Sequence, residues 1–511
     1  MGEEKNEKEP EIMHLSTEKH PKNDQAENKK LKKQNKTLKT WLLVLSIAVF
    51  LIGWLLGSLI PLPNTTGLRS LLSTAGKADS SEKINVVMNL MENSWFFADS
   101  IEDLDTRLTD QALKGITTND EDLHTEYMSA DEITQFTQSI NRNFVGIGVQ
   151  FTNSNGIPLV TKVIRNSPAE SAGVQAGDII YSVDGTKVEG MTSDEIVALV
   201  QGEENTKVTM VFKRGDDLVT MEITRAEVSN TIDGKITDEG YGYLQILQFG
   251  EGTADELKSY LDEFEENRVT SLIIDLRDDG GGYLDALKGV LSYFLPENTL
   301  ILQREYSDGT VVKTYTDQGQ YTSFGPIVLL VNGNTASAAE AFTLAMKEQR
   351  DDVTIVGETT YGKGTVQITK YFDDGSALKY TDSKWMSPEG VWVNGTGIAP
   401  DEEVKLPEVL YTSYTAMDEG DSYALDSVSD YTKEAQMLLQ YLGYDVDRTD
   451  GYFDESTQNA ILKYQQDQDM EETGVLDKDL YEGLISAVVL DWQTNEDHDP
   501  QLARAKEILN G

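Results

Sequence analysis

The chain has 511 residues, of which 39% are hydrophobic and 26% charged, and its formal net charge is -45. This length and composition suit a globular protein of about three or four domains. The negative charge argues against nucleic acid as a partner, because phosphate would be repelled. The chain has four histidines and no cysteine, which excludes disulfides, thiolate metal sites and cysteine nucleophiles. We expect neither a metal nor an organic cofactor.

Residues 1–40 are polar and rich in Lys, Glu and Asn, which is typical of a disordered tail. Residues 41–61 begin with WLLVLSIAVFLIGWLLGSLI, an uncharged run long enough to cross a bilayer as one helix. Lysines before the run and few after it place the tail in the cytoplasm and the remainder of the chain outside the cell membrane. A cleaved signal peptide is the alternative, but its apolar region is usually only about 7–15 residues long. No A-x-A-like site follows the run, so we expect a retained single-pass anchor.

Residues 67–142 are expected to form helices. Apolar residues recur at helical spacing through 84–97, and segment 129–144 opens with a Ser-x-x-Glu capping pattern at Ser129. Nothing in this region suggests chemistry, so we interpret it as a packing module. His124 is interpreted as a structural hydrogen-bonding residue.

At residue 143 the helical pattern gives way to strand and turn signals, and residues 143–228 predict a small domain rich in strands. GIGVQF is a strand start punctuated by glycines, and SPAESAGVQAGDIIYSVDG predicts a short helix at 168–172, a strand at 179–183 and a tight Asp-Gly turn. A helix at 193–200 and two further strands follow. The motif SPAESAGVQAGDIIYSVDG resembles that of circularly permuted PDZ domains in bacterial proteases.

The PDZ resemblance implies a peptide-binding loop formed by four residues, Gly146, Ile147, Gly148 and Val149. Successive backbone amides in such a loop suit the terminal carboxylate of a peptide, and an exposed strand edge beside them can accept an extended chain. A tight turn without a ligand is the alternative.

Strands and helices alternate through residues 232–406, the largest unit. The short strands SLIIDL and PIVLLVN have apolar centres, and they alternate with amphipathic helices such as ADELKSYLDEFEEN and YLDALKGVLSYFL. Apolar strands of this kind are covered on both faces by helices, so the pattern predicts a layered α/β domain.

Two motifs in this unit carry candidate chemistry. NGNTASAAE places Ser337 after a buried strand at the start of a predicted helix, and GETTYGKGTVQ places Lys363 between two glycines with Gln367 four residues later. A serine hydroxyl attacks an amide only when a base takes its proton, and a buried lysine has a lowered pKa that lets its neutral amine act as that base. A neutral amide can hold the amine without keeping it protonated. Because histidines are so few, we predict Ser337 as nucleophile, Lys363 as base and Gln367 as the residue that orients the base.

The tetrahedral oxyanion needs hydrogen-bond donors. The backbone N–H of Ala338, at the start of the predicted helix, is well directed for this. The glycine run 280–282 in IIDLRDDGGGYLDAL exposes further amides, although such a turn could equally bind phosphate. GETTYGKGT also nearly matches the phosphate-binding pattern G-x-x-x-x-G-K-[ST], but Gly364 replaces the hydroxyl residue and a strand follows, so we reject nucleotide binding. Taken singly, Ser337 could be a helix cap and Lys363 a surface residue.

The motifs DLRDDGGG, NGNTASAAE, GETTYGKGTVQ and GTGIAPDE together resemble those of the carboxyl-terminal processing peptidases, or tail-specific proteases, over roughly residues 67–406. The resemblance implies a core similar to the crotonase and ClpP folds. It also implies the same three roles for Ser337, Lys363 and Gln367.

By the same resemblance, Gly281 and Ala338 supply the oxyanion donors. The family's usual DLRNNPGG loop is DLRDDGGG here, with Asp279 and Gly280 in place of Asn and Pro. This difference changes the rigidity of the loop but keeps its amides.

The C-terminal part is expected to hold a polar linker (407–426), a small helical domain (427–488) and a final helix (489–511). Two amphipathic helices flank the turn YDVDRTDGYFDEST, and the pattern LQYLGY…DGYFDESTQNAILKYQ…TGVLD resembles a peptidoglycan-binding helical module. A structural appendage without a ligand is the alternative.

The sequence therefore predicts a multidomain α/β protein with one transmembrane helix, a PDZ domain, a serine peptidase core and a C-terminal helical domain. The expected function is a serine endopeptidase of the bacterial cell envelope that cleaves exported proteins near their C-termini, with the PDZ domain capturing or gating substrate tails. Expected partners are proteins with free C-termini, the membrane, peptidoglycan and, from the family's terminal helices, a second copy in a homodimer. The alternative is a PDZ and wall-binding scaffold whose catalytic site is vestigial.

Overall fold

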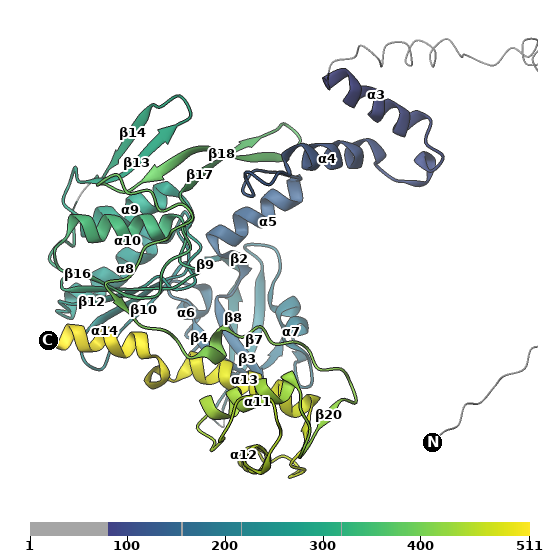
Figure 1. Ribbon diagram of the computed structural model, residues 1–511, viewed down its shortest axis with the longest axis vertical. Coiled ribbons are helices and arrows are strands. Elements are labelled where there is room, and N and C mark those ends of the chain that lie inside the picture. The colour runs from purple at the N-terminus through teal and green to yellow at the C-terminus, as the bar shows by residue number, and fades with distance from the viewer. Residues whose placement is uncertain (1–79, 155–156, 216, 318) are drawn as a thin grey trace, which may run out of the picture. The chain divides into compact units, whose positions relative to one another are not determined.

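The computed structural model describes residues 80–511 apart from 155–156, 216 and 318 (Figure 1). The chain divides into two compact units, Met1–Thr109 and Asp110–Gly511, and each is described by itself. The described part of the first unit holds α3 (Ser80–Asn93), the short 3-10 helix η1 (Ala98–Ser100) and the start of α4 (Leu104–Thr117).

The predicted tail (1–40) and the predicted membrane helix (41–61) lie outside the described residues. Within the part of the chain that the structure describes, no helix combines the length and the hydrophobicity that crossing a membrane requires. In the second unit, α5 (Ala130–Asn141) begins with the predicted cap, because the Ser129 N–H donates to Glu132 Oε2 (2.9 Å).

The PDZ-like region contains a six-stranded antiparallel sheet in the order β3-β4-β5-β7-β8, with β6 paired to β5. The helix at 168–172 and the strand at 179–183 have the predicted bounds. β2 and β9 pair with each other, so the chain enters and leaves this region at neighbouring points. The elements are β2 (Asn143–Gly146), β3 (Val149–Ser154), β4 (Ile157–Val163), α6 (Pro168–Ala172), β5 (Ile179–Val183), β6 (Thr186–Lys187), α7 (Ser193–Val200), β7 (Lys207–Arg214), β8 (Asp217–Thr224) and β9 (Ala226–Ser229).

The largest unit is built on a six-stranded sheet in the order β10-β11-β12-β15-β16-β19, in which only β10 is antiparallel to its neighbour. β12 and β15 are buried along their whole length, and all of their residues except Asp275 are apolar. Residues of α8, α9 and α10 form one large core with the sheet. The elements are β10 (Ile232–Ile236), β11 (Gly242–Ile246), α8 (Thr253–Glu266), β12 (Leu272–Asp275), α9 (Leu284–Phe294), β15 (Ile327–Val331), α10 (Ala338–Gln349), β16 (Val353–Gly357) and β19 (Glu402–Glu403).

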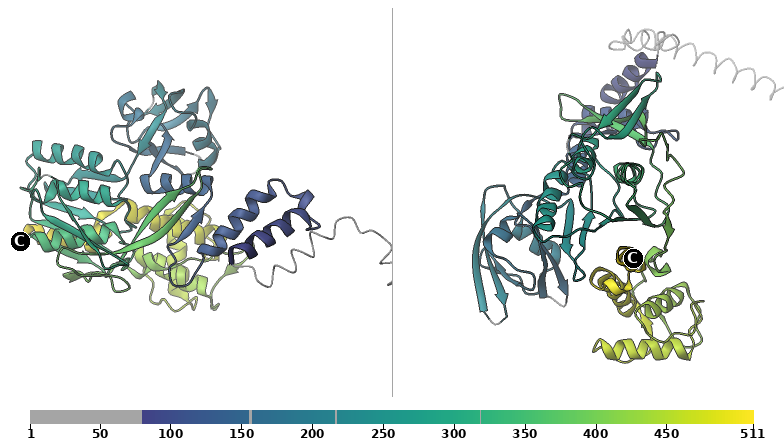
Figure 2. Two further views of the ribbon diagram at one scale, coloured as in Figure 1. Left: turned by 90° about the horizontal axis from the view of Figure 1, so that it is seen from above. Right: turned by 90° about the vertical axis from the view of Figure 1, so that its left-hand side faces the viewer.

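The second face of this sheet is covered by α14 (Pro500–Asn510), the last helix of the chain (Figure 1; Figure 2). Leu502 and Ala505 of α14 share a buried cluster with Ile273 and Val328 of the sheet. The layered α/β prediction is thus confirmed, and a helix from beyond the predicted core (232–406) packs on its sheet. Strands that are buried on both faces need a second layer, and the chain supplies it from its far end.

A second, five-stranded sheet carries part of the candidate site. Its strand β18 pairs with β1, β13 and β17. Because β1 lies in the region predicted to be helical (67–142), that prediction needs correction here; a three-residue strand is too short to show a period. The strands are β1 (Glu126–Met128), β13 (Leu300–Tyr306), β14 (Val311–Tyr315), β17 (Thr365–Tyr371) and β18 (Ala377–Met386).

The C-terminal helical domain has its own core, which differs from the prediction at both ends. The expected linker (407–426) is partly folded, because Val409 and Met417 are buried in this core. The expected single helix 489–511 is interrupted: α13 ends at Thr494, a short 3-10 helix follows, and α14 begins at Pro500 with Asp499 as its cap. The elements are η2 (Glu408–Tyr411), β20 (Ser422–Tyr423), α11 (Asp430–Tyr441), α12 (Glu455–Asp467), β21 (Leu476–Asp477), α13 (Lys478–Thr494) and η3 (Glu496–His498).

Candidate active site

Three predicted residues from two motifs, Ser337, Lys363 and Gln367, line one cavity of about 670 Å³. Ser337 follows β15 and Lys363 follows β16, so both come after the carboxyl ends of neighbouring parallel strands. Ala338 also lines the cavity, together with the glycines on either side of Gly281. The three predicted side chains and Ala338 thus come together in one place.

Ser337 has a strained backbone conformation, with φ 56° and ψ -114°. Positive φ is uncommon outside glycine, and such strain persists only where the surrounding structure enforces it, often at active sites. The residue joins β15 to α10, and its side chain is partly exposed at the cavity. Gly281 passes so close that a Cβ atom there would lie 2.7 Å from Ser337 Cβ, so a side chain at this position would displace the serine turn.

A residue that the motifs did not single out, Glu340, connects the serine turn to the lysine turn. Its side chain is fully buried (0% exposed). Oε2 accepts from the N–H groups of Ser337 (2.9 Å) and Lys363 (2.8 Å). Oε1 accepts from Gly362 N–H (2.7 Å) and Thr360 Oγ1 (2.6 Å).

Four donors on one carboxylate fix the two turns relative to each other, because hydrogen bonds to a charged acceptor are about twice as strong as neutral ones. Trp385 adds a further restraint, since its indole N–H donates to Lys363 O (2.7 Å). The sequence signal that could have found Glu340 is the spacing Ser337-Ala-Ala-Glu340, which is that of a capping box.

Lys363 is partly buried, and burial lowers the pKa of its ammonium group. The positive charge of Lys379, which lines the same cavity, lowers that pKa further. Both effects disfavour the charged form and increase the fraction of neutral amine, as a general base requires.

Gln367 is held by two threonines. Its Nε2 donates to Thr365 Oγ1 and to Thr381 Oγ1 (3.0 Å each), which leaves its Oε1 available as an acceptor. Within the described part of the chain, no hydrogen bond joins Lys363 Nζ to Ser337 or to Gln367. The orienting role of Gln367 therefore stays a prediction.

The two predicted oxyanion donors differ. No acceptor for the Ala338 N–H is found among the described residues. The Gly281 N–H donates to Asp279 Oδ1 (2.8 Å), so the amide predicted as the second donor is already bonded in this structure. The short Asp side chain reaches the amide two residues on, as in an Asx turn.

Asp279 itself is fully buried, and burial raises the pKa of its carboxyl group well above the usual range. Its Oδ2 has no hydrogen-bond partner among the described residues. Burial therefore favours the protonated form of this carboxyl group, and in that form it would place no negative charge near a developing oxyanion.

His124, interpreted from the sequence as structural, lies in the loop before β1. Its backbone N–H donates to Asp122 Oδ1 (3.1 Å). Burial lowers the pKa of its imidazole. The positive charge of Lys363 lowers that pKa further, so the His124 and Lys363 side chains influence each other's charge state. Over the residues that the structure describes, no cluster of three or more His, Cys, Asp or Glu side chains could hold a metal.

The predicted peptide-binding loop lines a second, smaller cavity of about 210 Å³ between β3 and α7. All four residues of the loop contribute to it, along with Val197 and Val200. The carbonyls of Ile147 and Gly148 accept from Ala169 N–H (2.8 Å) and Ile164 N–H (3.0 Å), whereas no acceptor for the amides of Ile147 and Gly148 is found in the described part of the chain. A groove with apolar walls and unbonded amides suits a peptide that ends in an apolar residue and a carboxylate.

Comparison with protein families agrees with this geometry. Residues 240–404 match the family described as Peptidase family S41, residues 159–214 match the PDZ domain, and residues 429–484 match a peptidoglycan binding domain. The peptidase match contains both turns that Glu340 joins. The chain is therefore a serine-type peptidase with a PDZ domain and a peptidoglycan-binding domain.

Relatives match nearly the whole chain. A CtpA-like serine protease of Staphylococcus haemolyticus is 31% identical over 94% of this chain and 94% of its own length. The carboxy-terminal processing protease CtpA of Bacillus subtilis is 32% identical over 87% of this chain and 94% of its own length. Among solved structures, the photosystem II D1 C-terminal processing protease is 25% identical, covers 65% of this chain and 95% of its own, and has a TM-score of 0.37. The chain belongs to the CtpA-like carboxy-terminal processing proteases of peptidase family S41.

Proposed function

We propose that this protein is a membrane-anchored endopeptidase of the bacterial cell envelope that cleaves exported proteins near their C-termini with a Ser337–Lys363 dyad. The observation that carries the proposal is one cavity at which a strained, accessible serine and a lysine of lowered pKa come together. The carboxylate of Glu340 holds the backbones of both residues.

In this mechanism the Lys363 amine takes the proton of the Ser337 hydroxyl as Oγ attacks the scissile carbonyl carbon. The Ala338 N–H donates to the resulting oxyanion. Lys363 then gives its proton to the leaving nitrogen, the C–N bond breaks, and an acyl ester remains on Ser337. A water molecule, deprotonated by the same amine, attacks the ester carbon. The bond to Ser337 Oγ breaks, Lys363 returns its proton to Oγ, and the shortened protein is released.

The test is turnover by the full chain in detergent micelles, with an unfolded protein that has a free C-terminus as substrate. Ser337→Ala is expected to abolish cleavage, whereas Ser323→Ala, at an exposed loop serine, is the matched control and keeps wild-type turnover. Equal cleavage by wild type and Ser337→Ala would refute the assignment. Absence of cleavage by wild-type protein would favour the scaffold alternative.

Removal of the charge at Lys379 is expected to shift the pH dependence of turnover. Lys379 forms an ion pair with Glu126, so Lys379→Met removes a cation near Lys363 and leaves an unpaired carboxylate. Both changes favour the ammonium form and raise the pKa of Lys363. Since the base acts in its neutral form, the low-pH limb of kcat/KM moves to higher pH. Lys370→Met, at an exposed position on β17, is the control, and an unmoved limb in Lys379→Met would contradict the prediction.

The PDZ domain is proposed to capture substrate tails through the amides of Ile147 and Gly148. A peptide whose C-terminus is amidated is expected to bind about tenfold more weakly than the free acid, because hydrogen bonds to a charged group contribute about 1.5–3 kcal/mol. Fluorescence anisotropy with the full-length Ser337→Ala protein measures this without cleavage. A peptide that loses one internal carboxylate (Glu→Gln) is the control, and unchanged affinity after amidation would mean that the groove recognises another feature.

Two segments outside the peptidase core are proposed to fix the location of the enzyme. The uncharged run 41–61 would anchor it in the membrane, and the peptidoglycan-binding domain would hold the peptidase near the cell wall. The substrates are then exported proteins with free C-termini, and the family's terminal helices favour a homodimer.

A further inference from the structure

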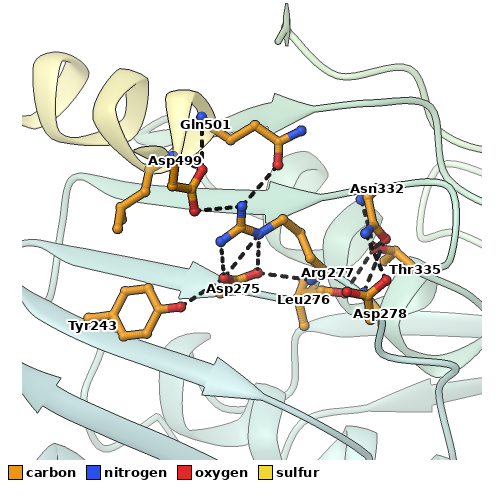
Figure 3. A network of polar contacts seen from close by, with 10 residues as sticks. Tyr243, Asp275, Leu276, Arg277, Asp278, Asn332, Thr335, Asp499 and Gln501 are labelled. Atoms are coloured by element: carbon orange, nitrogen blue, oxygen red, sulfur yellow. Dashed lines mark hydrogen bonds and ion pairs between the residues drawn. The ribbon is translucent and has the colours of Figure 1, made fainter. Parts of the chain in front are cut away.

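Arg277 lies at the start of the glycine loop, two residues after the end of β12, and is almost buried (8% exposed). On the sheet side its guanidinium binds Asp275: Nε donates to Oδ1 (2.9 Å) and Nη2 donates to Oδ2 (2.6 Å). Asp275 also accepts from Tyr243 OH (2.8 Å) (Figure 3). The arginine is therefore fixed to the sheet that carries the candidate site.

The remaining guanidinium nitrogen is bound by the C-terminal helix α14. Arg277 Nη1 lies 2.8 Å from Asp499 Oδ2 and donates to Gln501 Oε1 (3.1 Å) (Figure 3). Trp492, near the end of α13, has its ring centroid 5.7 Å from the guanidinium carbon. A single buried arginine of the glycine loop is thus contacted by the last two helices of the chain.

The residue after Arg277 bonds the glycine loop to the turn that precedes Ser337. The Asp278 N–H donates to Asn332 Oδ1 (3.1 Å). In return, Asn332 Nδ2 and Asn334 Nδ2 donate to Asp278 Oδ1 (2.9 and 2.8 Å). A displacement of Arg277 would therefore shift the glycine loop and the serine turn together.

The peptidoglycan-binding domain lies in the chain between two points that are bonded to the core. The chain leaves the core at Val404, whose N–H donates to Gly357 O (2.9 Å), and returns at Asp499. The two points are bonded to each other as well, because Gln501 Nε2 donates to Val404 O (2.7 Å). The domain is thus an insertion into the peptidase and not an appendage at its end.

We propose that Asp499 is a positioning residue of the peptidase, acting through Arg277 on the glycine loop and, through Asp278, on the serine turn that carries the Ala338 oxyanion donor. The proposal rests on the proposed function of the Ser337 site. Asp499 binds the one guanidinium nitrogen, Nη1, that Asp275 does not bind, and it does so from the residue at which the chain returns to the core. Small displacements of catalytic groups by distant changes can cost on the order of 10²-fold in rate, so the contact acts on turnover and not on substrate affinity.

The test compares Asp499→Asn with Arg504→Gln in the full chain in detergent micelles. Asn caps helices as well as Asp does, so α14 keeps its cap while Arg277 loses the charge of its partner. Arg504 lies on the same helix and forms a surface ion pair with Glu402 (2.5 Å), away from the glycine loop. We expect kcat to fall about tenfold or more in Asp499→Asn with KM unchanged, and wild-type kcat in Arg504→Gln.

Two results would overturn the proposal: wild-type kcat in Asp499→Asn, or an equal fall of kcat in both variants, which would assign the effect to helix docking in general. If Asp499→Asn does not fold, Trp492→Leu removes the α13 contact to the same arginine, and wild-type kcat in that variant overturns the proposal equally. Ser337→Ala measured in parallel separates the two hypotheses, because turnover that survives Ser337→Ala rejects the proposed function itself.

Discussion

Lys363→Met is expected to lower kcat by about 10⁴-fold or more, with the protein still folded. Methionine fills a similar volume but carries no proton acceptor, so the Ser337 hydroxyl loses its base, and loss of a base in such a catalytic unit has effects of this size. The measurement is turnover of an unfolded protein substrate together with the thermal midpoint of unfolding. Lys370→Met, on the neighbouring strand, is the control and keeps wild-type kcat.

The same experiment distinguishes lysine from histidine as the base. His124 is within electrostatic reach of Lys363 and has a lowered pKa, so a histidine base is the competing mechanism. We expect His124→Gln to keep most of the activity. Loss of turnover in His124→Gln combined with activity in Lys363→Met would show that His124, and not Lys363, is the general base.

Glu340→Gln is expected to destabilise the fold and the site together. The Gln amide nitrogen cannot accept, so two of the four donors that now face Glu340 would be left buried without a partner. Each unsatisfied buried donor costs about 1–3 kcal/mol, so the free energy of unfolding should fall by about 3 kcal/mol. We also expect kcat to fall about 10²-fold, because the serine and lysine turns lose their common restraint.

The matched control for Glu340 is Glu348→Gln, on the same helix. Glu348 is partly buried and accepts one backbone hydrogen bond, from Glu389 N–H (2.8 Å), which the Gln carbonyl can still receive. Its effect on the free energy of unfolding should stay below about 1 kcal/mol. The free energy of unfolding is measured by denaturant unfolding. Equal losses in the two variants would show that the Glu340 carboxylate does not hold the serine turn and the lysine turn together.

Short-range patterns predicted much of the fold and the site. The apolar strands β12 and β15 were recognisable because they are buried on both faces, α6 because Pro168 and Gly173 bound it, and α7 because its apolar residues recur at helical spacing. Ser337 and Lys363 stood out because glycines and small residues surround them at turns. Local sequence patterns therefore singled out two residues that the fold brings to one cavity.

Long-range contacts could not be predicted in this way. The pairing of β1 with β18 and the ion pair between Arg277 and Asp499 join residues that are distant in the sequence. The Asp279 bond to Gly281 is local, but it depends on side-chain conformation, which no periodic pattern encodes. The far end of the chain was therefore predicted only as a final helix, and its packing on the peptidase sheet was not anticipated.

The central claim is that an uncharged amine at position 363 takes the serine proton. The chain has no cysteine, so Lys363→Cys introduces a single thiol, and 2-bromoethylamine converts it to a lysine analogue in which sulfur replaces one methylene. The sulfur withdraws electrons and lowers the pKa of the amine. We predict that Lys363→Cys is inactive, that alkylation restores turnover, and that the low-pH limb of kcat/KM then lies at lower pH than in the wild type. Complete alkylation without recovery, or recovery with an unmoved limb, would contradict the claim.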